Sequence, residues 1–313
     1  MNKTGYFTHP DCRRHEMGQG HPECPERLDA IDDRLLLTGV IDALDRREAP
    51  LANTDDIELA HDSDHVASMG ALAERIGAAG RGYAQIDPDT SMNPFTWNAI
   101  RRGAGAAIAA TDAVMKGELE NAFCAVRPPG HHATHNRAMG FCIFNNVAIA
   151  ARYALERHGL KRVAIVDFDV HHGNGTEDIL AGDERVLMVG IFQSPFYPGS
   201  GYPPLASNMV NLPIPAYTKG DVIRRKIEQE WLPRLEEFKP EMIFISAGFD
   251  AHREDDLGQL GLVEADYTWM TQQIKAIANK HAKGRIVSSL EGGYNLDALG
   301  RSVEAHVRVL ADI

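Results

Sequence analysis

Short β-branched runs alternate with longer helix-patterned segments in the second half of this 313-residue chain. The apolar runs predict buried strands, and the segments with apolar residues three or four apart predict helices. The predicted strands cover residues 122–127, 162–168, 186–192, 242–247 and 285–290, and the predicted helices cover residues 146–158, 221–238, 264–281 and 296–311. Such alternation predicts an α/β fold in which a central parallel sheet is flanked by helices on both faces.

The first part of the chain predicts two more helices, over residues 25–37 and 94–116, joined by polar loops that contain glycine. Ser/Gly linkers, internal repeats and low-complexity tracts are not found in the sequence. We therefore expect one catalytic α/β domain over residues 1–313. In such a sheet the ligand site lies beyond the carboxyl ends of the strands, so functional residues should follow the strands directly.

The charge balance is acidic, since 32 Lys and Arg face 44 Asp and Glu, which gives a formal net charge of −12. A nucleic-acid partner is not expected, because the phosphate backbone is bound by clustered basic residues and this chain has no basic run. A solvated acidic surface is the simplest interpretation of the excess, and a cationic or neutral partner would fit it.

The longest apolar stretches, such as residues 104–110, fall short of the roughly 20 residues that cross a bilayer, so no membrane segment is expected. The amino-terminal residues show neither an apolar core nor a small-residue cleavage site, which leads us to expect a cytoplasmic protein. The four cysteines form no Cys-x-x-Cys pair, and we expect reduced, mostly buried thiols.

A Gly-x-Gly-x-x-Ala run begins at Gly103 and superficially matches a dinucleotide-binding fingerprint. The fingerprint requires a strand directly before it, whereas this run lies inside the predicted helix 94–116. Small residues that allow close helix packing explain the run better.

Chemically active side chains follow the predicted strands. A Pro-Pro-Gly turn after the first strand presents His131 and His132. Asp167, Asp169 and His171 stand at the end of the next strand, where residues two apart point to the same side. Two more groups follow later strands: Asp250, and Tyr294 after two glycines.

Asp169, His171 and Asp250 would offer a metal two carboxylates and one imidazole and leave a position open, which is the pattern of a catalytic site. Such ligands suit Zn²⁺ best, with Fe²⁺ or Co²⁺ as alternatives. Two anionic ligands reduce the effective charge of the metal, so its water should need a general base.

The adjacent histidines can supply that base. Asp167 and Asn174 are the candidate partners of His131 and His132, and a carboxylate raises the pKa of an imidazole more than an amide does. The less basic histidine then suits proton transfer, and Tyr294 can donate a hydrogen bond to a developing oxyanion. Each of these residues alone would most simply be structural, but together they predict metal-assisted hydrolysis of an amide.

These motifs closely resemble those of the histone deacetylase superfamily, arginase-like zinc amidohydrolases that include acetylpolyamine amidohydrolases and acetoin-utilisation proteins. The resemblance covers nearly the whole chain, and Asn174 with the His-Pro-x-x-Pro-x-Arg-like opening resembles the class II branch and its bacterial relatives. The matching segments are Arg-Pro-Pro-Gly-His-His at 127–132, Gly-Phe-Cys-Ile-Phe-Asn-Asn at 140–146, and residues 21–28, 167–175, 246–252 and 291–295.

The resemblance implies one Zn²⁺ held by Asp169, His171 and Asp250. It implies that His132 is the general base and then the acid, that His131 is its electrostatic partner, and that Tyr294 polarises the carbonyl.

The family lines an acyl-lysine tunnel with aromatic residues, and the matching positions here are Phe141 and Tyr197, with Gly293 in the same wall. The family also has a structural K⁺ site. Its oxygens would come here from Asp167, Asp169, His171, Gly190 and Ile191.

The chain departs from the family pattern in two places. Gly190 stands where a serine is usual in the potassium site, and Phe192 stands where a histidine is common. Polyamine-specific relatives carry an acidic gatekeeper after the last zinc aspartate, and the aligned residue here is Leu257, which favours acyl-lysine. Glu254, Asp255 and Asp256 lie close by in sequence and can pair with an ammonium group.

The leading hypothesis is therefore a zinc-dependent deacetylase that acts on N-acetyl-lysine in proteins or peptides. An acetylpolyamine or acetyl-diamine amidohydrolase with the same mechanism is the first alternative. A non-catalytic acyl-binding scaffold and a binuclear manganese hydrolase are more distant ones, and a homo-oligomer stays open.

Overall fold

The computed structural model describes residues 3–80 and 82–313. Its centre is an eight-stranded sheet in the order β2-β1-β5-β10-β9-β6-β7-β8, in which every neighbouring pair is parallel. Its strands are β1 (Thr4–Thr8), β2 (Leu44–Glu48), β5 (Asn121–Cys124), β6 (Val163–Asp167), β7 (Val186–Gln193), β8 (Met209–Ile214), β9 (Met242–Ala247) and β10 (Ile286–Leu290). The predicted parallel sheet is thus confirmed.

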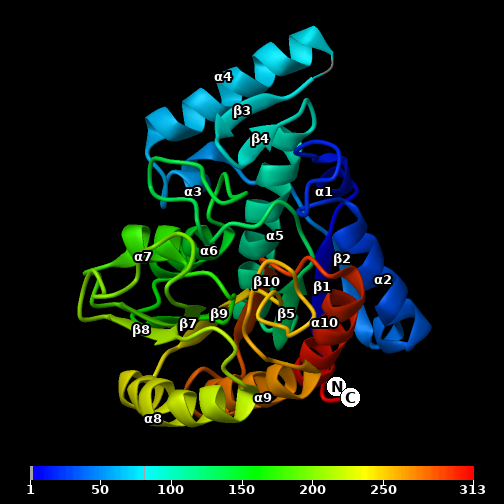
Figure 1. Ribbon diagram of the computed structural model, residues 1–313. Helices are drawn as coiled ribbons and strands as arrows, with labels where there is room; N and C mark the ends of the chain where they lie inside the picture. The colour runs from blue at the N-terminus through cyan, green and yellow to red at the C-terminus, as the bar shows by residue number, and fades with distance from the viewer. Residues whose placement is uncertain (1–2, 81) are drawn as a thin grey trace.

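Helices cover both faces of this sheet, as predicted (Figure 1). The long helices α5 (Thr96–Met115) and α6 (Asn146–Glu156) lie on one side, and α8 (Gly220–Phe238), α9 (Glu264–His281) and α10 (Leu296–Ala311) lie on the other. The remaining helices are α1 (Asp11–Arg14), α2 (Glu26–Leu37), α3 (Thr54–Ile57), α4 (Ser63–Ala79), α7 (Asn174–Leu180) and the 3₁₀ turn η1 (Val40–Ala43). Helix α2 packs against α10, which joins the amino-terminal segment to the end of the chain.

All five predicted strands and all six predicted helices are present, with ends that differ by no more than a few residues. The four central strands β5, β6, β9 and β10 are buried along their whole length. A parallel strand that is covered on both faces needs apolar residues at every position, which is why continuous apolar runs predicted these strands well.

Three sheet strands were not predicted, because none of them has the continuous apolar run that indicates a buried strand. The edge strand β2 contains four charged residues among five and buries only its first side chain, that of Leu44. The opposite edge strand β8 contains Pro213, and the five residues of β1 include a glycine and two threonines. Polar residues and proline are tolerated at sheet edges because one side of an edge strand has no partner.

An antiparallel hairpin of β3 (Ala84–Asp87) and β4 (Thr90–Met92) stands apart from the main sheet and was also not predicted. Its turn contains Asp89, which lies near the carboxyl ends of the main strands through contacts described below.

The glycine run at Gly103 packs tightly, as its position inside helix α5 predicted. A Cβ atom on Gly105 would lie 1.9 Å from the carbonyl oxygen of Pro50, and one on Gly103 would lie 2.9 Å from Oδ1 of Asn146.

The four cysteines are free, and Cys24 is the only partly exposed one. Within residues 3–80 and 82–313, no helix combines the length and the apolarity that crossing a membrane requires.

Candidate active site

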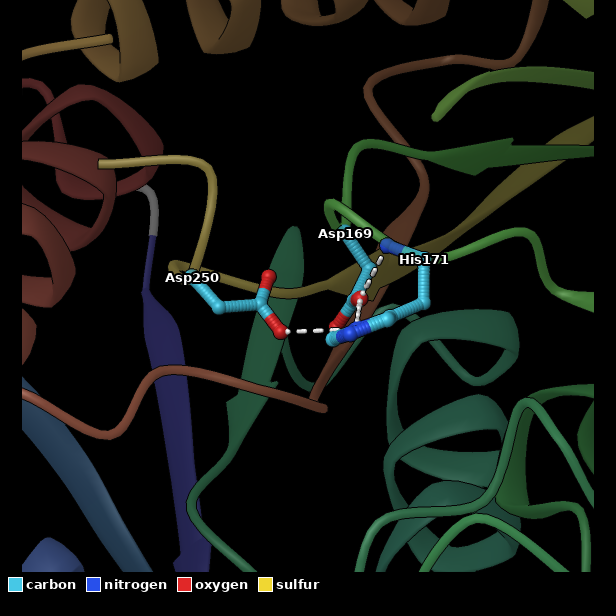
Figure 2. Close-up of side chains that lie close together, drawn as sticks. All are labelled: Asp169, His171 and Asp250. Carbon is cyan, nitrogen blue, oxygen red and sulfur yellow. Dashed lines mark hydrogen bonds and ion pairs between the residues drawn. The ribbon is translucent and has the colours of Figure 1, made fainter. Parts of the chain in front are cut away.

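Three potential metal ligands converge at the carboxyl ends of two adjacent strands. Asp169 and His171 follow β6, and Asp250 follows β9. One ligand atom from each residue lies within 4.8 Å of the others. The Nδ1 atom of His171 is 3.0 Å from Oδ1 of Asp169 and 3.2 Å from Oδ2 of Asp250 (Figure 2). The sequence predicted this convergence from the spacing of Asp169 and His171 and from the place of Asp250 after another strand.

The cluster fits a divalent cation. Both carboxylates are fully buried, and Oδ2 of Asp250 has no hydrogen-bond donor among the described residues. The other oxygens are oriented by peptide N–H groups: Val170 donates to Oδ1 of Asp250 at 2.9 Å, and Gly292 donates to Oδ2 of Asp169 at 2.9 Å. A buried carboxylate oxygen without a donor is costly unless a cation compensates it. Two oxygens and an imidazole nitrogen form a donor set that zinc accepts.

The electrostatics of the cluster reflect its crowding. Burial and the neighbouring Asp169 raise the pKa of Asp250 to about 7. Although burial opposes it, the positively charged form of His131 and the hydrogen bond from His171 hold the pKa of Asp169 well below its usual range. Against the effect of burial, the hydrogen bond to Asp169 and the nearby carboxylate of Asp250 raise the pKa of His171 to about 10. A cation must therefore displace protons when it binds here.

The two predicted histidines follow β5 and lie beside the cluster, with ring centroids 4.1 Å apart. The Nδ1 atom of His131 donates to Oδ2 of Asp167 at 3.0 Å, and the Nδ1 atom of His132 donates to Oδ1 of Asn174 at 2.7 Å. The orientation of the Asn174 amide is supported by its Nδ2 group, which donates to the carbonyl oxygen of His132 at 3.4 Å. The unshared lone pair of His132 is therefore on Nε2.

The different partners give the two imidazoles opposite properties. Against the effect of burial, Asp169 and Asp167 raise the pKa of His131 well above its ordinary value. Burial, together with the nearby His131 and His171, lowers the pKa of His132 well below its ordinary value. His131 is thus charged and His132 neutral near pH 7. This is the division that the sequence predicted from a carboxylate partner and an amide partner.

Glycine is required where the main chain approaches the side chains of the site. A Cβ atom on Gly292 would lie 2.0 Å from Oδ2 of Asp250, and one on Gly140 would lie 2.5 Å from Cδ2 of His132. Gly140 also has a φ of 57°, and the following Phe141 has a φ of 68°. Such left-handed values are unusual for a bulky residue and must be held by the surrounding contacts.

A cavity of about 290 Å³ is lined by His132 of the histidine pair and by His171 of the ligand cluster. The predicted residues Phe141, Tyr197, Leu257 and Tyr294 line it. The rings of Phe141 and Tyr294 meet edge to face at 5.9 Å, and those of His132 and Tyr197 at 5.2 Å. Aromatic walls of this size suit a narrow, apolar acyl chain.

Gly293 does not line this cavity, contrary to the expectation. Its carbonyl oxygen instead accepts a hydrogen bond of 2.6 Å from Nε of Arg27, so the peptide faces the amino-terminal helix α2. Conversely, Asp89, Gly140 and Phe196 line the cavity without having been predicted to do so, and Asp256, one of the three carboxylates expected to be able to pair with an ammonium group, lines it as well.

Asp89 comes from the β3–β4 turn, and its position depends on a contact that sequence reasoning could not find. Its Oδ1 atom accepts from the N–H of Gly140 at 3.1 Å, and the hydroxyl of Thr90 accepts from the N–H of Phe141 at 2.9 Å. These bonds hold the left-handed turn that places Phe141 in the wall. Phe196 stacks on His171 with ring centroids 5.3 Å apart. The one sequence feature that could have indicated its place in the cavity wall is its position directly before Tyr197.

His172 and His252 are buried and do not line the cavity. His172 lies between Oγ of Ser200 and a carboxylate oxygen of Glu177, at 2.9 Å and 3.1 Å. This contact joins the strand end that carries His171 to the loop that carries Tyr197. A structural role therefore accounts for His172.

The residues expected around a second cation also come together. Asp167 and Gly190 are direct neighbours across the β6–β7 pair. Both carboxylate oxygens of Asp167 already accept hydrogen bonds, from the N–H of Asp169 and from His131. A Cβ atom on Gly190 would lie 3.7 Å from the nearest atom, so a serine would fit there.

Comparisons with known proteins agree with this geometry. The family model described as "Histone deacetylase domain" matches residues 21–310. An uncharacterised protein of Synechocystis is 38% identical over 296 residues, with 93% of each chain covered. A probable deacetylase of Archaeoglobus fulgidus is 36% identical over 302 residues, covering 94% of this chain and 82% of the relative. A histone deacetylase-like amidohydrolase of Pseudomonas aeruginosa is 37% identical over 283 residues, covering 88% and 73%.

The crystal structure of the HDA15 HD domain superposes with a TM-score of 0.93 at 33% identity, covering all of this chain and 90% of that chain. The fold and the site therefore define an enzyme that hydrolyses amides. The chain belongs to the histone deacetylase family.

Proposed function

We propose that this protein is a zinc-dependent deacetylase that hydrolyses the acetyl amide of N-acetyl-lysine in proteins or peptides and yields acetate and the free amine. One observation carries the proposal: His171, one of the three residues of the ligand cluster, lines the same cavity as a neutral histidine, His132, and a tyrosine, Tyr294. Ligands, base and hydrogen-bond donor are the three components that amide hydrolysis needs.

Asp169, His171 and Asp250 would hold the cation, with Zn²⁺ as the best match to two carboxylates and an imidazole, and Fe²⁺ or Co²⁺ as alternatives. When bound, the cation supplies Lewis acidity, which lowers the pKa of water and polarises the amide carbonyl. The unpaired oxygen of buried Asp250 supports this assignment.

His132 takes the proton from the attacking water at Nε2, since its Nδ1–H is held by Asn174. Its low pKa keeps it neutral and ready to accept that proton. It then returns the proton to the nitrogen of the leaving amine. His131, charged and bound to Asp167, stays protonated and stabilises the negative charge that develops on the substrate.

Tyr294 donates its hydroxyl proton in a hydrogen bond to the carbonyl oxygen as that oxygen gains negative charge. Burial and the nearby Asp250 raise the pKa of Tyr294 well above its ordinary value, so the phenol stays protonated and remains a donor. Phe141 and Tyr197 flank the acyl-bearing chain and exclude water from it.

The preference for acetyl-lysine rests on apolar Leu257 in the cavity wall. Two carboxylates in the same wall, Asp89 and Asp256, favour a second candidate, acetylated polyamines or diamines, whose free ammonium groups carboxylates can bind.

A structural potassium ion, held by oxygens of Asp167, Asp169, His171, Gly190 and Ile191, is less well supported. Gly190 brings no hydroxyl, and the Asp167 carboxylate already accepts two hydrogen bonds. The main-chain oxygens would have to provide most of the ligands.

The test is the initial rate of zinc-loaded protein on acetyl-lysine peptides, N-acetylputrescine, N-acetylcadaverine and acetylspermidines, with Tyr294→Phe as the control. Preference for peptides supports the proposal, and preference for free acetylated amines moves the function to the second candidate. No hydrolysis of either class by zinc-bound protein contradicts both and would return attention to a non-catalytic acyl-binding protein.

A further inference from the structure

Glu291 is a completely buried carboxylate for which neither the family motifs nor the proposed mechanism provides a role. It follows β10 directly, at the carboxyl edge of the sheet, three residues before Tyr294. Within the described part of the chain it forms no ion pair, and its oxygens meet only neutral donors. Burying a carboxylate without a cationic partner costs folding free energy, so the presence of Glu291 at this place calls for an explanation.

The side chain of Glu291 is hydrogen-bonded to the turn that carries His131 and His132. Its Oε2 atom accepts from the peptide N–H of Gly130 at 2.6 Å and from that of His131 at 3.1 Å. Its Oε1 atom accepts from the hydroxyl of Ser246, at the end of β9, at 3.1 Å. One carboxylate therefore links the turn after β5 to the ends of β9 and β10 through hydrogen bonds.

The main chain of Glu291 is held from the opposite side, together with the loop that carries Tyr294. The guanidinium of buried Arg27, on helix α2, donates to the carbonyl oxygens of both Glu291 and Gly293. Its Cζ atom lies 5.0 Å from the centroid of the Tyr294 ring. Asp255 completes the arrangement, because its Oδ2 atom accepts from the N–H of Tyr294 at 2.6 Å.

We propose that Glu291 is a positioning residue that sets the separation between the imidazole pair and the phenol of Tyr294. Its side chain fixes the histidine turn, and its main chain belongs to the Arg27-bound loop that presents Tyr294. The proposal rests on the proposed function, in which His132 and Tyr294 act on opposite parts of one amide.

Hydrogen bonding, rather than charge, carries this role. Burial raises the pKa of Glu291 to about 7, against the opposing effect of charged His131. A protonated Glu291 would keep Oε2 as the acceptor of both peptide N–H groups and would donate from Oε1 to Ser246. A glutamine can form the same three bonds through its oxygen and its amide.

The first test compares Glu291→Gln, Glu291→Asp and Glu291→Ala in the zinc-loaded enzyme on its best acetylated substrate. We expect Glu291→Gln to keep kcat within about fivefold, because the three bonds survive. Glu291→Ala and the shorter Glu291→Asp should lower kcat by about 10²-fold with little change in KM, because small displacements of catalytic groups act on the reacting geometry. Ser289→Ala, which removes a buried hydroxyl that has no hydrogen-bond partner among the described residues and lies two residues before Glu291, on β10, is the matched control and should behave as the wild type.

The second test needs no activity. Amide hydrogen exchange over residues 126–134 should accelerate in Glu291→Ala and Glu291→Asp but not in Glu291→Gln or Ser289→Ala, because the two clamped N–H groups lose their acceptor. If the wild type hydrolyses no acetylated substrate, the proposed function fails. This measurement still tests whether Glu291 holds the peptide N–H groups of Gly130 and His131.

Two results would overturn the positioning role. One is a folded Glu291→Ala or Glu291→Asp variant with a wild-type kcat. The other is a Glu291→Gln variant that keeps wild-type exchange and yet loses kcat by 10²-fold or more, which would assign the role to the charge. If the alanine and aspartate variants do not fold, the glutamine variant decides alone.

Discussion

The floor and the mouth of the cavity are built differently. On the floor, formed by the histidine pair and the ligand cluster, each histidine of the pair and each carboxylate of the cluster has a dedicated partner: Asp167 for His131, Asn174 for His132, and a peptide N–H for Asp169 and for Asp250. At the mouth, Tyr197 and Asp256 are exposed and extend from loops. The difference indicates that the chemistry is preorganised by strand ends, whereas substrate choice is left to segments that can vary without disturbing it.

The largest difference between floor and mouth should appear when one carboxylate is neutralised in each region. Asp250→Asn removes a ligand charge from the buried cluster, and we expect activity to fall by more than about 10³-fold because the open metal site is lost. Asp256→Asn, at the mouth, is the matched control. Zinc content by elemental analysis and initial rates provide the measurement, and comparable losses in the two variants would refute the distinction between floor and mouth.

Removing the phenol hydroxyl with Tyr294→Phe should lower kcat by about 10²–10³-fold and leave KM nearly unchanged, because the donor acts mainly as charge develops on the carbonyl oxygen. Steady-state kinetics on the preferred substrate measure both constants. Tyr197→Phe, which removes the hydroxyl at the mouth, should keep kcat near wild type. A kcat that survives in Tyr294→Phe would argue against the proposed donor.

The partner of His132 should control the acidic limb of the pH profile. In Asn174→Asp a carboxylate replaces the amide 2.7 Å from Nδ1, and this raises the pKa of His132 from its lowered value. Because the neutral form is the base, the acidic limb of kcat/KM should move to higher pH, by about one unit, with up to tenfold less activity below it. An unmoved limb would show that another group titrates there.

The mouth variants should give the smallest effects. Asp89→Asn and Asp256→Asn remove the carboxylates from the cavity wall, and KM for substrates with a second ammonium group should rise by about threefold to tenfold. The kcat should stay constant, because neither carboxylate belongs to the ligand cluster or the histidine pair, and an asparagine at position 89 keeps the oxygen that accepts from the N–H of Gly140. Neutral acetyl-lysine analogues serve as the reference, and an equal rise in their KM would contradict ammonium recognition.

The floor could be predicted from sequence because its residues follow buried strands at fixed spacing. Asp169 and His171 point to one side because strand geometry alternates, and Asp250 arrives from the adjacent strand β9. The mouth could not be predicted in the same way. Asp89 reaches the cavity through a hairpin turn that contacts Gly140 far along the chain, and no local pattern encodes such a contact.

Gly293 shows a second limit of sequence reasoning. Its place beside Tyr294 predicted a wall position, whereas its carbonyl oxygen is bound by Arg27, a residue 266 positions away. The buried carboxylate of Glu291 was matched only as part of a motif, because its three donors lie in the turn after β5 and at the end of strand β9, which come together only on folding.

The central claim, a single catalytic metal site on a preorganised floor, is tested most directly by titrating metal-depleted protein with Zn²⁺ and measuring acetate release from an acetyl-lysine peptide. The account predicts negligible activity without metal, a rise with added zinc, and a plateau at one ion per chain that Asp250→Asn does not reach. Full activity in the metal-free protein, or a plateau only at two ions per chain, would contradict it.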